Sequence, residues 1–221
     1  MGVAVLVPGT SANLGPGFDS FGLALDVSNR FEAELASEWS VHVQGEGAGH
    51  LRTDGRNRVA QAMARAFAEA GRPELRASID CVNHIALGNG LGSSAAAIVG
   101  GLLLGERLAE VELGQQRLME LATEMEGHPD NVAAALVGGF TVCWNDGTKP
   151  HFASFQPARG LAAVVVVATG ELSTRKARMM LPEAVPHADA AFNVAHAGLL
   201  AASIATGRPE LLGAALEDRL H

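Results

Sequence analysis

The chain has 221 residues, a formal net charge of −8 and 48% hydrophobic residues, so it can form one large or two small domains with a buried core. Its 24 acidic against 16 basic residues argue against nucleic-acid binding, because the basic cluster around Arg175, Lys176 and Arg178 is only local. The two cysteines match no zinc or disulfide spacing, no signal peptide is evident, and the longest apolar runs are too short for a bilayer. We therefore expect a cytoplasmic protein with no membrane partner.

The first half of the chain predicts strands from apolar–polar alternation and helices from apolar residues at helical spacing. The predicted strands are Val3–Val7, Phe31–Leu35, Val41–Val43 and Ile79–Cys81. The second and third of these are expected to pair as a two-stranded meander. The predicted helices are Val59–Ala70 and Ser94–Leu108. The second helix is apolar nearly all round, so it should be largely buried.

The second half predicts more helix than strand. The predicted helices are Leu118–Met125, Asp130–Ala135 with Asp130 as its cap, Thr174–Leu181, Asp189–Ile204 and Pro209–Leu220. The predicted strands are Phe140–Trp144 and Leu161–Ala168. Residues 145–160 are rich in Gly, Pro and polar residues and are the best candidate for a domain boundary. Strands and helices mix without a strict βαβ rhythm, which indicates an α+β fold.

The glycine-rich segment Leu87–Ala97 contains three glycines, then two serines that open an apolar helix. Glycine lets backbone amides approach a ligand, and a helix N-terminus presents unpaired N–H groups and a positive dipole end. The segment predicts a nucleotide phosphate site, in which Ser93 and Ser94 cap the helix or offer a hydroxyl to a metal. It lacks the lysine of a Walker A motif. The alternative is a serine-capped turn without a ligand.

Two further segments carry polar side chains at loops. Residues 8–19 follow a strand, and their prolines and glycines fix the loop from which Asn13 and Asp19 project. Asx-turn capping without a ligand is the alternative there. Residues 124–131 place three carboxylates, an imidazole and an amide at a helix break, which suits Mg²⁺ held by a carboxylate and a serine hydroxyl. A solvated acidic helix end is the alternative for this segment.

Together these segments resemble the homoserine kinase family of the GHMP kinase superfamily, over essentially the whole chain. The matching segments are Ser11–Asp19 with Gly22–Leu25, Gly90–Ala96, Glu126–Val132, Leu172–Thr174 with Ala177–Arg178 and Leu181–Pro182, Phe192–Asn193 and Asp218–His221. The resemblance implies ATP-dependent phosphorylation of L-homoserine to O-phospho-L-homoserine, a step of threonine biosynthesis. ATP and Mg²⁺ are the implied cofactors, and a homodimer is a possible assembly.

The resemblance also implies roles for individual residues. The implied ATP-binding residues are Asn57, Leu87, Gly88, Asn89, Gly90, Leu91, Gly92, Ser93, Ser94, Ala95 and Ala96, with Ser94 and Glu124 as the metal ligands. The implied substrate-binding residues are Asn13, Asp19, His128 and Arg178, and the implied catalytic residues are His128, Asn131 and Thr174. Asp19 would bind the substrate ammonium and Arg178 its carboxylate, for which a guanidinium is well shaped.

The implied architecture is the GHMP kinase fold, with a ribosomal-protein-S5-like nucleotide domain at 1–155 and the start of a ferredoxin-like domain at 156–221. The chain departs from the family at Ala86, Asn89 and His196, where a proline, a basic residue and an arginine are usual. It also stops at His221, so we expect an incomplete kinase. The alternatives are another GHMP kinase acting on a small alcohol, and a truncated, catalytically silent nucleotide-binding protein.

Overall fold

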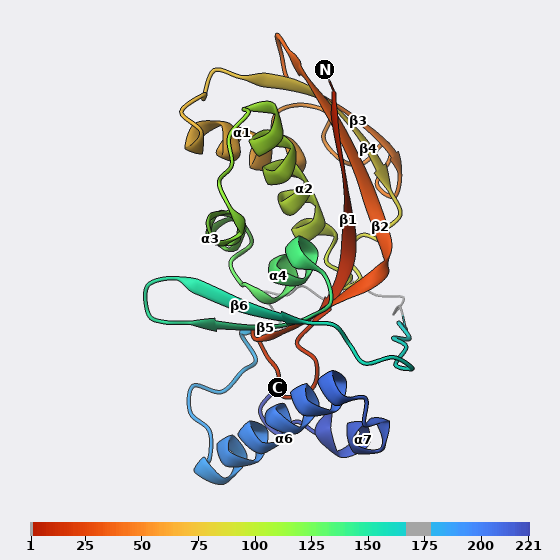
Figure 1. Cartoon of the computed structure of the whole chain (residues 1–221), viewed down its shortest axis with the longest axis vertical. Helices are drawn as coiled ribbons and strands as arrows, with labels where there is room; N and C mark the ends of the chain where they lie inside the picture. The colour runs from red at the N-terminus through yellow and green to blue at the C-terminus, as the bar shows by residue number, and fades with distance from the viewer. Residues whose placement is uncertain (1, 167–177) are drawn as a thin grey trace.

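The computed structural model describes residues 2–166 and 178–221, which are built around a six-stranded sheet (Figure 1). The strands are β1 (Val3–Ala12), β2 (Phe21–Ala36), β3 (Ser40–Gly45), β4 (Arg76–Asn83), β5 (Phe140–Asn145) and β6 (Pro150–Phe155). Their order is β3-β4-β2-β5-β6, and β1 also pairs with the long strand β2. All pairs are antiparallel except β3 with β4.

Four helices cover one face of this sheet (Figure 1). They are α1 (Arg58–Glu69), α2 (Ser93–Leu108), α3 (Gln115–Glu126) and α4 (Asp130–Val137). The almost wholly apolar α2 lies at the centre of the main core, where Ile98, Leu102 and Leu104 are fully buried against residues of β1, β2 and α1. Burial of this kind is the main stabilising term of a domain. The α+β expectation is confirmed.

The predicted meander at 31–35 and 41–43 is wrong in its pairing. Both segments are strands, but β4 lies between them, with Ile79 opposite Ala33 of β2 and Val41 of β3. The connection from β3 to β4 runs through α1, and parallel strands require such a crossover. Adjacency in sequence favours a hairpin, whereas packing α1 on the sheet places β4 beside both strands.

The segment 145–160, the best candidate for a domain boundary, contains β6, which the sequence did not predict. β5 and β6 form a hairpin whose turn depends on Asp146, because its Oδ1 accepts hydrogen bonds from the Thr148 and Lys149 amides at 2.8 and 2.9 Å. Short polar turns between paired strands are read poorly from composition alone. The turn chemistry of Asp explains why this one is stable.

Two predicted elements of the C-terminal part are wrong. Residues 161–166, the described part of the predicted strand 161–168, pair with no strand of the described residues, and Val164 and Val166 are 87% and 90% exposed. A strand forms only where a neighbour completes its hydrogen bonds. The predicted helix 209–220 is a 3₁₀ turn at Pro209–Leu211 followed by the short helix α7 (Leu212–Ala215). The predicted helix 174–181 lies largely outside the described residues.

The helix α6 (His187–Thr206) packs with α7 below the sheet in Figure 1. By length and composition alone α6 could cross a membrane, although the longest apolar runs of the sequence are too short for a bilayer. One such helix is weak evidence for a membrane protein. Here α6 carries the buried Asn193, whose Nδ2 donates to Asp218 Oδ1 at 2.8 Å.

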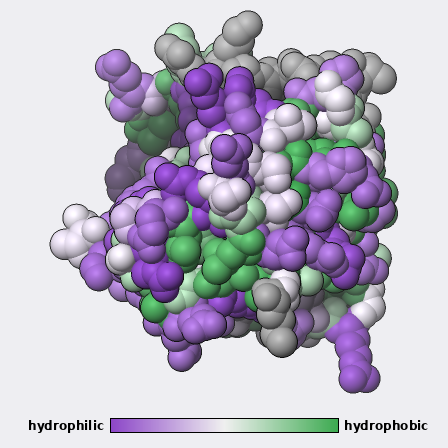
Figure 2. Space-filling model, turned by 90° about the horizontal axis from the view of Figure 1, so that it is seen from above, coloured by the Kyte–Doolittle hydropathy of each residue, from purple (hydrophilic) through white to green (hydrophobic). Residues whose placement is uncertain are grey.

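Viewed from above, hydrophilic residues cover most of the end of the molecule opposite α6 and α7, with hydrophobic residues between them (Figure 2).

Gly101 lies where α2 crosses α1, and a Cβ on it would lie 2.3 Å from the Val59 carbonyl oxygen. We expect Gly101→Ala to lower the free energy of unfolding by about 2–3 kcal/mol, because the two helices must separate in a close-packed core. Gly198 on α6 has no atom within 4 Å of such a Cβ, so Gly198→Ala should raise the stability by about 0.5–1 kcal/mol. Urea unfolding measures both. Equal stability of Gly101→Ala and the unchanged chain would contradict close packing of α1 on α2.

Candidate active site

Three segments far apart in sequence meet at the end of β1. The Thr10 amide donates to the Leu91 carbonyl at 3.0 Å, and the Thr10 hydroxyl donates to Asn131 Oδ1 at 2.8 Å. Thr10 therefore joins the first loop, the glycine-rich loop and the start of α4. This residue was not singled out in the sequence, although it stands inside the segment 8–19.

The glycine-rich loop has the backbone that its glycines permit. Gly88, Gly90 and Gly92 have φ of +73°, +71° and +67°, in the left-handed region where a Cβ is strained. Gly92 is the N-cap of α2 and no side chain caps this helix, so the expected serine cap is wrong. Because Gly92 occupies the cap position, the first amides of α2 stay unpaired by side chains. They are suited to bind an anion.

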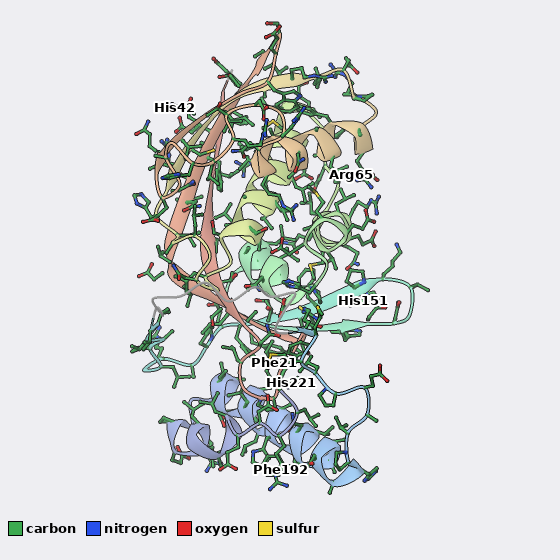
Figure 3. The ribbon with its side chains drawn as sticks, turned by 180° about the vertical axis from the view of Figure 1, so that it is seen from behind. Phe21, His42, Arg65, His151, Phe192 and His221 are labelled. Atoms are coloured by element: carbon green, nitrogen blue, oxygen red, sulfur yellow. The ribbon has the colours of Figure 1, made fainter. Side chains whose placement is uncertain are left out.

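The Ser94 hydroxyl donates to Glu126 Oε2 at 2.7 Å, which joins the start of α2 to the end of α3. Glu124, the expected metal ligand, faces the other way: its carboxylate lies 3.3 Å from Arg65 Nη2 and 3.9 Å from Arg117 Nη1. Figure 3 labels Arg65 on α1. The structure thus pairs Ser94 with Glu126 in place of Glu124. The signal was present in the sequence, because Glu126 opens the Glu-Gly-His-Pro-Asp-Asn segment.

The Ser94–Glu126 pair fits Mg²⁺. Mg²⁺ prefers hard oxygen ligands and keeps several waters or phosphate oxygens, so one carboxylate and one hydroxyl are a suitable protein contribution. Among the described residues no group of three or more His, Cys, Asp or Glu could hold a metal by itself. A site of this kind would therefore need nucleotide phosphates to complete the coordination.

A cavity of about 470 Å³ opens beside Ser94 and the glycine-rich loop, with Phe31, Val43 and Leu87 among its apolar lining residues. Asn57 also lines it, but both ends of its amide are used: Oδ1 accepts from the Val59 amide at 3.0 Å and Nδ2 donates to the Arg52 carbonyl at 2.7 Å. Asn57 therefore caps α1 and orders the cavity wall. The cavity's size and apolar walls suit a nucleotide base.

Three arginines line the same cavity, namely Arg52, Arg56 and Arg58. In the sequence only the cluster around Arg178 was predicted to be basic, because Arg52 and Arg56 are four positions apart with the acidic Asp54 between them, and Arg58 follows two positions later. Their convergence depends on the loop that Asp54 organises, because Asp54 accepts from Arg52 and from the Arg56 amide.

At the other end of the site, Arg178 forms a two-bond ion pair with Asp19, and its Nη1 lies 2.8 Å from Asp19 Oδ2. The Arg178 guanidinium also lies 4.9 Å from the centre of the Phe18 ring, which stacks on His221 at 4.4 Å. The Asp19 amide donates to Asn13 Oδ1 at 2.9 Å. This bond spans six residues, so it closes the loop rather than forming an Asx turn, and the loop presents the Asp19 carboxylate to Arg178. Thr174 lies outside the described residues.

His128 and Asp130 form a second polar pair, with the partly buried His128 placing its Nδ1 2.8 Å from Asp130 Oδ1. Asp130 is fully buried, and its Oδ1 also accepts from the Asn131 amide, so it does not act as the predicted helix cap. Its hydrogen bond raises the pKa of His128 above the ordinary value of 6.5, against the opposing effect of burial. The negative charge of Glu126 raises it further, and the positive charge of Arg178 lowers it.

The His128–Asp130 pair should make the folded state more stable at low pH. Because the pKa of His128 is raised in the folded protein, its stabilisation is complete below about pH 6.5 and is lost as the pH rises through the folded-state pKa. Asp130→Asn should lower the pKa of His128 and remove this dependence. An NMR titration of the imidazole checks the pKa. An equally high pKa in Asp130→Asn would contradict the role of the carboxylate.

Comparison with known proteins identifies the class of protein to which this fold belongs. Residues 57–139 match the family model described as the GHMP kinases N terminal domain. A Streptococcus pneumoniae phosphomevalonate kinase has the same fold, with a TM-score of 0.68 at 12% identity over 98% of this chain and 77% of that one. The expected GHMP kinase fold is confirmed.

Within that class the relatives point to one family. The homoserine kinase of Clavibacter michiganensis subsp. michiganensis is 47% identical over 99% of this chain and 70% of its own length. That of Streptomyces avermitilis is 44% identical over 99% and 73%. The crystal structure of the Cytophaga hutchinsonii homoserine kinase matches with a TM-score of 0.85 at 27% identity, covering 99% of this chain and 72% of that one. The chain belongs to the homoserine kinase family, as its motifs indicated.

Proposed function

We propose that this chain transfers a phosphoryl group from ATP to the side-chain hydroxyl of L-homoserine, with Mg²⁺, to give O-phospho-L-homoserine for threonine biosynthesis. The observation that carries the proposal is the placement of His128. His128 pairs with Asp130, and its pKa is raised by the charge of Glu126 and lowered by that of Arg178. His128 therefore lies between the Ser94–Glu126 pair and the Asp19–Arg178 pair. A pair that would hold Mg²⁺ and a pair suited to an amino acid thus share one site.

Different groups among the described residues would bind the phosphates and the Mg²⁺ in such a transfer. The unpaired amides at the start of α2 would bind phosphate oxygens, and Ser94 with Glu126 would hold Mg²⁺. Bound Mg²⁺ would offset negative charge on the transferring group and the leaving oxygen. Positioning and electrostatics supply most of the catalysis in phosphoryl transfer, so these contacts are sufficient without a covalent step on the protein.

The Asp19–Arg178 pair explains how an amino acid would be selected. In the structure each charge neutralises the other. A zwitterion brings an ammonium for Asp19 and a carboxylate for Arg178, so it can replace both partners at once. A ligand with only one charge leaves the other side chain unpaired, which is costly. This exchange favours homoserine over a mevalonate-like or sugar alcohol.

His128 is suited to hold charge beside the reacting groups. Because the hydrogen bond with Asp130 raises the pKa of His128, it favours the protonated imidazole, which is suited to donate a hydrogen bond. Asn131, whose Oδ1 is held by Thr10, has its carboxamide orientation set by that bond. We therefore assign both residues to orienting the substrate hydroxyl and the phosphoryl group, with no general base.

The test is Mg²⁺-dependent release of ADP from ATP by the purified chain, with and without L-homoserine. Release stimulated by homoserine supports the proposal. Nucleotide binding without stimulation, in a chain shown to be folded, would leave a nucleotide-binding protein in place of an active kinase. The domain division at residue 155, a cytoplasmic location and a homodimer stay predictions.

A further inference from the structure

Arg58, in the first turn of α1, reaches the end of α3. Its Nη2 donates to the Met125 carbonyl oxygen at 2.7 Å and lies 3.3 Å from Glu126 Oε2. That same oxygen accepts the Ser94 hydroxyl at 2.7 Å. The guanidinium and the hydroxyl therefore share one carboxylate oxygen of the residue suited to hold Mg²⁺. The Glu126 side chain is 11% exposed and that of Arg58 is 43% exposed, so Arg58 lies on the open side of the pair.

Arg58 is one of three arginines that lie near the glycine-rich loop. The glycine-rich loop, residues 87–92, carries no charged side chain. The adjoining cavity is lined by Arg52, Arg56 and Arg58 and by no acidic residue among those described. Arg52 is held by Asp54 through two hydrogen bonds of 2.9 and 2.6 Å. Of the three arginines, Arg58 is the one that contacts Glu126 in the Ser94–Glu126 pair.

We propose that Arg58 is a positioning residue of the nucleotide site, which holds Glu126 beside Ser94 when the site is empty and pairs with nucleotide phosphate when it is filled. The proposal rests on the nucleotide-binding part of the proposed function. The contact of the half-exposed Arg58 guanidinium with Glu126 is long, at 3.3 Å, so exchanging it for a contact with phosphate loses little stability. A guanidinium matches phosphate oxygens well and would supply the charge that the glycine-rich loop lacks.

A purely structural role must be separated from this one. The Met125 carbonyl lies in the last turn of α3, where cations stabilise the helix end, so Arg58 could act only as a cap. Glutamine keeps an N–H donor for that carbonyl and removes the charge. Arg65 offers a matched control on the same helix, because its Nη2 lies 3.3 Å from Glu124 Oε2, away from Ser94.

The experiment measures equilibrium binding of ADP to the whole chain, in EDTA and in Mg²⁺, without homoserine. Arg58→Gln should weaken metal-free ADP binding by about tenfold, the worth of one charge-assisted contact. With Mg²⁺ the loss should fall to about threefold, because the metal neutralises part of the same charge. Arg65→Gln should stay within about twofold in both, as expected for an exposed surface pair. Arg58→Lys, which keeps the charge, should recover most of the affinity.

Each contrary result overturns the proposal. ADP affinity of Arg58→Gln equal to that of the unchanged chain, with only a lower melting temperature, would make Arg58 a structural cap. An equal loss of ADP affinity in Arg65→Gln would show that the effect comes from the net charge of the protein and not from a contact of Arg58. Absence of ADP binding by the unchanged chain would remove the nucleotide site altogether. Because homoserine is left out, a chain that binds ADP through Arg58 but does not phosphorylate homoserine would refute the proposed function alone.

Discussion

Replacing Glu126 by glutamine is expected to lower the turnover number by about 100- to 1000-fold, a loss of roughly 3–4 kcal/mol of transition-state stabilisation. Glutamine has the same shape but no charge, so it keeps the contact with Ser94 and binds Mg²⁺ poorly. The activity that remains should need much higher Mg²⁺. Steady-state kinetics over a range of Mg²⁺ concentrations measures both effects.

Glu124→Gln is the control, since Glu124 lies two residues away on the same helix and faces Arg65 and Arg117. We expect its turnover and its Mg²⁺ dependence to stay within about twofold of the unchanged chain, because exposed ion pairs contribute little. The opposite ranking, with Glu124→Gln inactive and Glu126→Gln active, would restore Glu124 as the metal ligand.

Arg178→Gln should lower kcat/KM for L-homoserine by about 100-fold, because two charge-assisted hydrogen bonds to the substrate carboxylate are lost. The KM for ATP should change little, since Arg178 lies at the other end of the site, beside Phe18 and Asp19. The preference for homoserine over 3-aminopropan-1-ol, which lacks the carboxylate, should largely disappear. Competition kinetics with the two alcohols measures this preference.

Arg219→Gln tests whether any arginine of the C-terminal part would have the same effect. Arg219 packs over the Phe192 ring at 3.8 Å and approaches Asp189 at 3.4 Å, away from Asp19. Its loss should leave the preference between the two alcohols unchanged. If Arg178→Gln kept the preference as well, the assignment of Arg178 to the carboxylate would fail.

The sequence by itself determined the order of most elements and the family. Residues 76–108 were read correctly as strand, glycine-rich loop and buried helix, because apolar periodicity and glycines act over a few neighbouring residues. The three polar segments were also recognised, and Thr10 does bring them together. Motifs of this kind are made of neighbouring residues, so they can be recognised in a single sequence.

Only the tertiary structure decided which side chains face one another. Glu124 and Glu126 are two positions apart, which turns them about 200° around α3, and the packing of α3 against α2 selects Glu126 for Ser94. The Asp19–Arg178 pair joins residues 159 positions apart, and Arg58 reaches Glu126 across 68. Contacts over such separations depend on how helices and loops dock on the sheet, and this docking leaves no pattern in neighbouring residues.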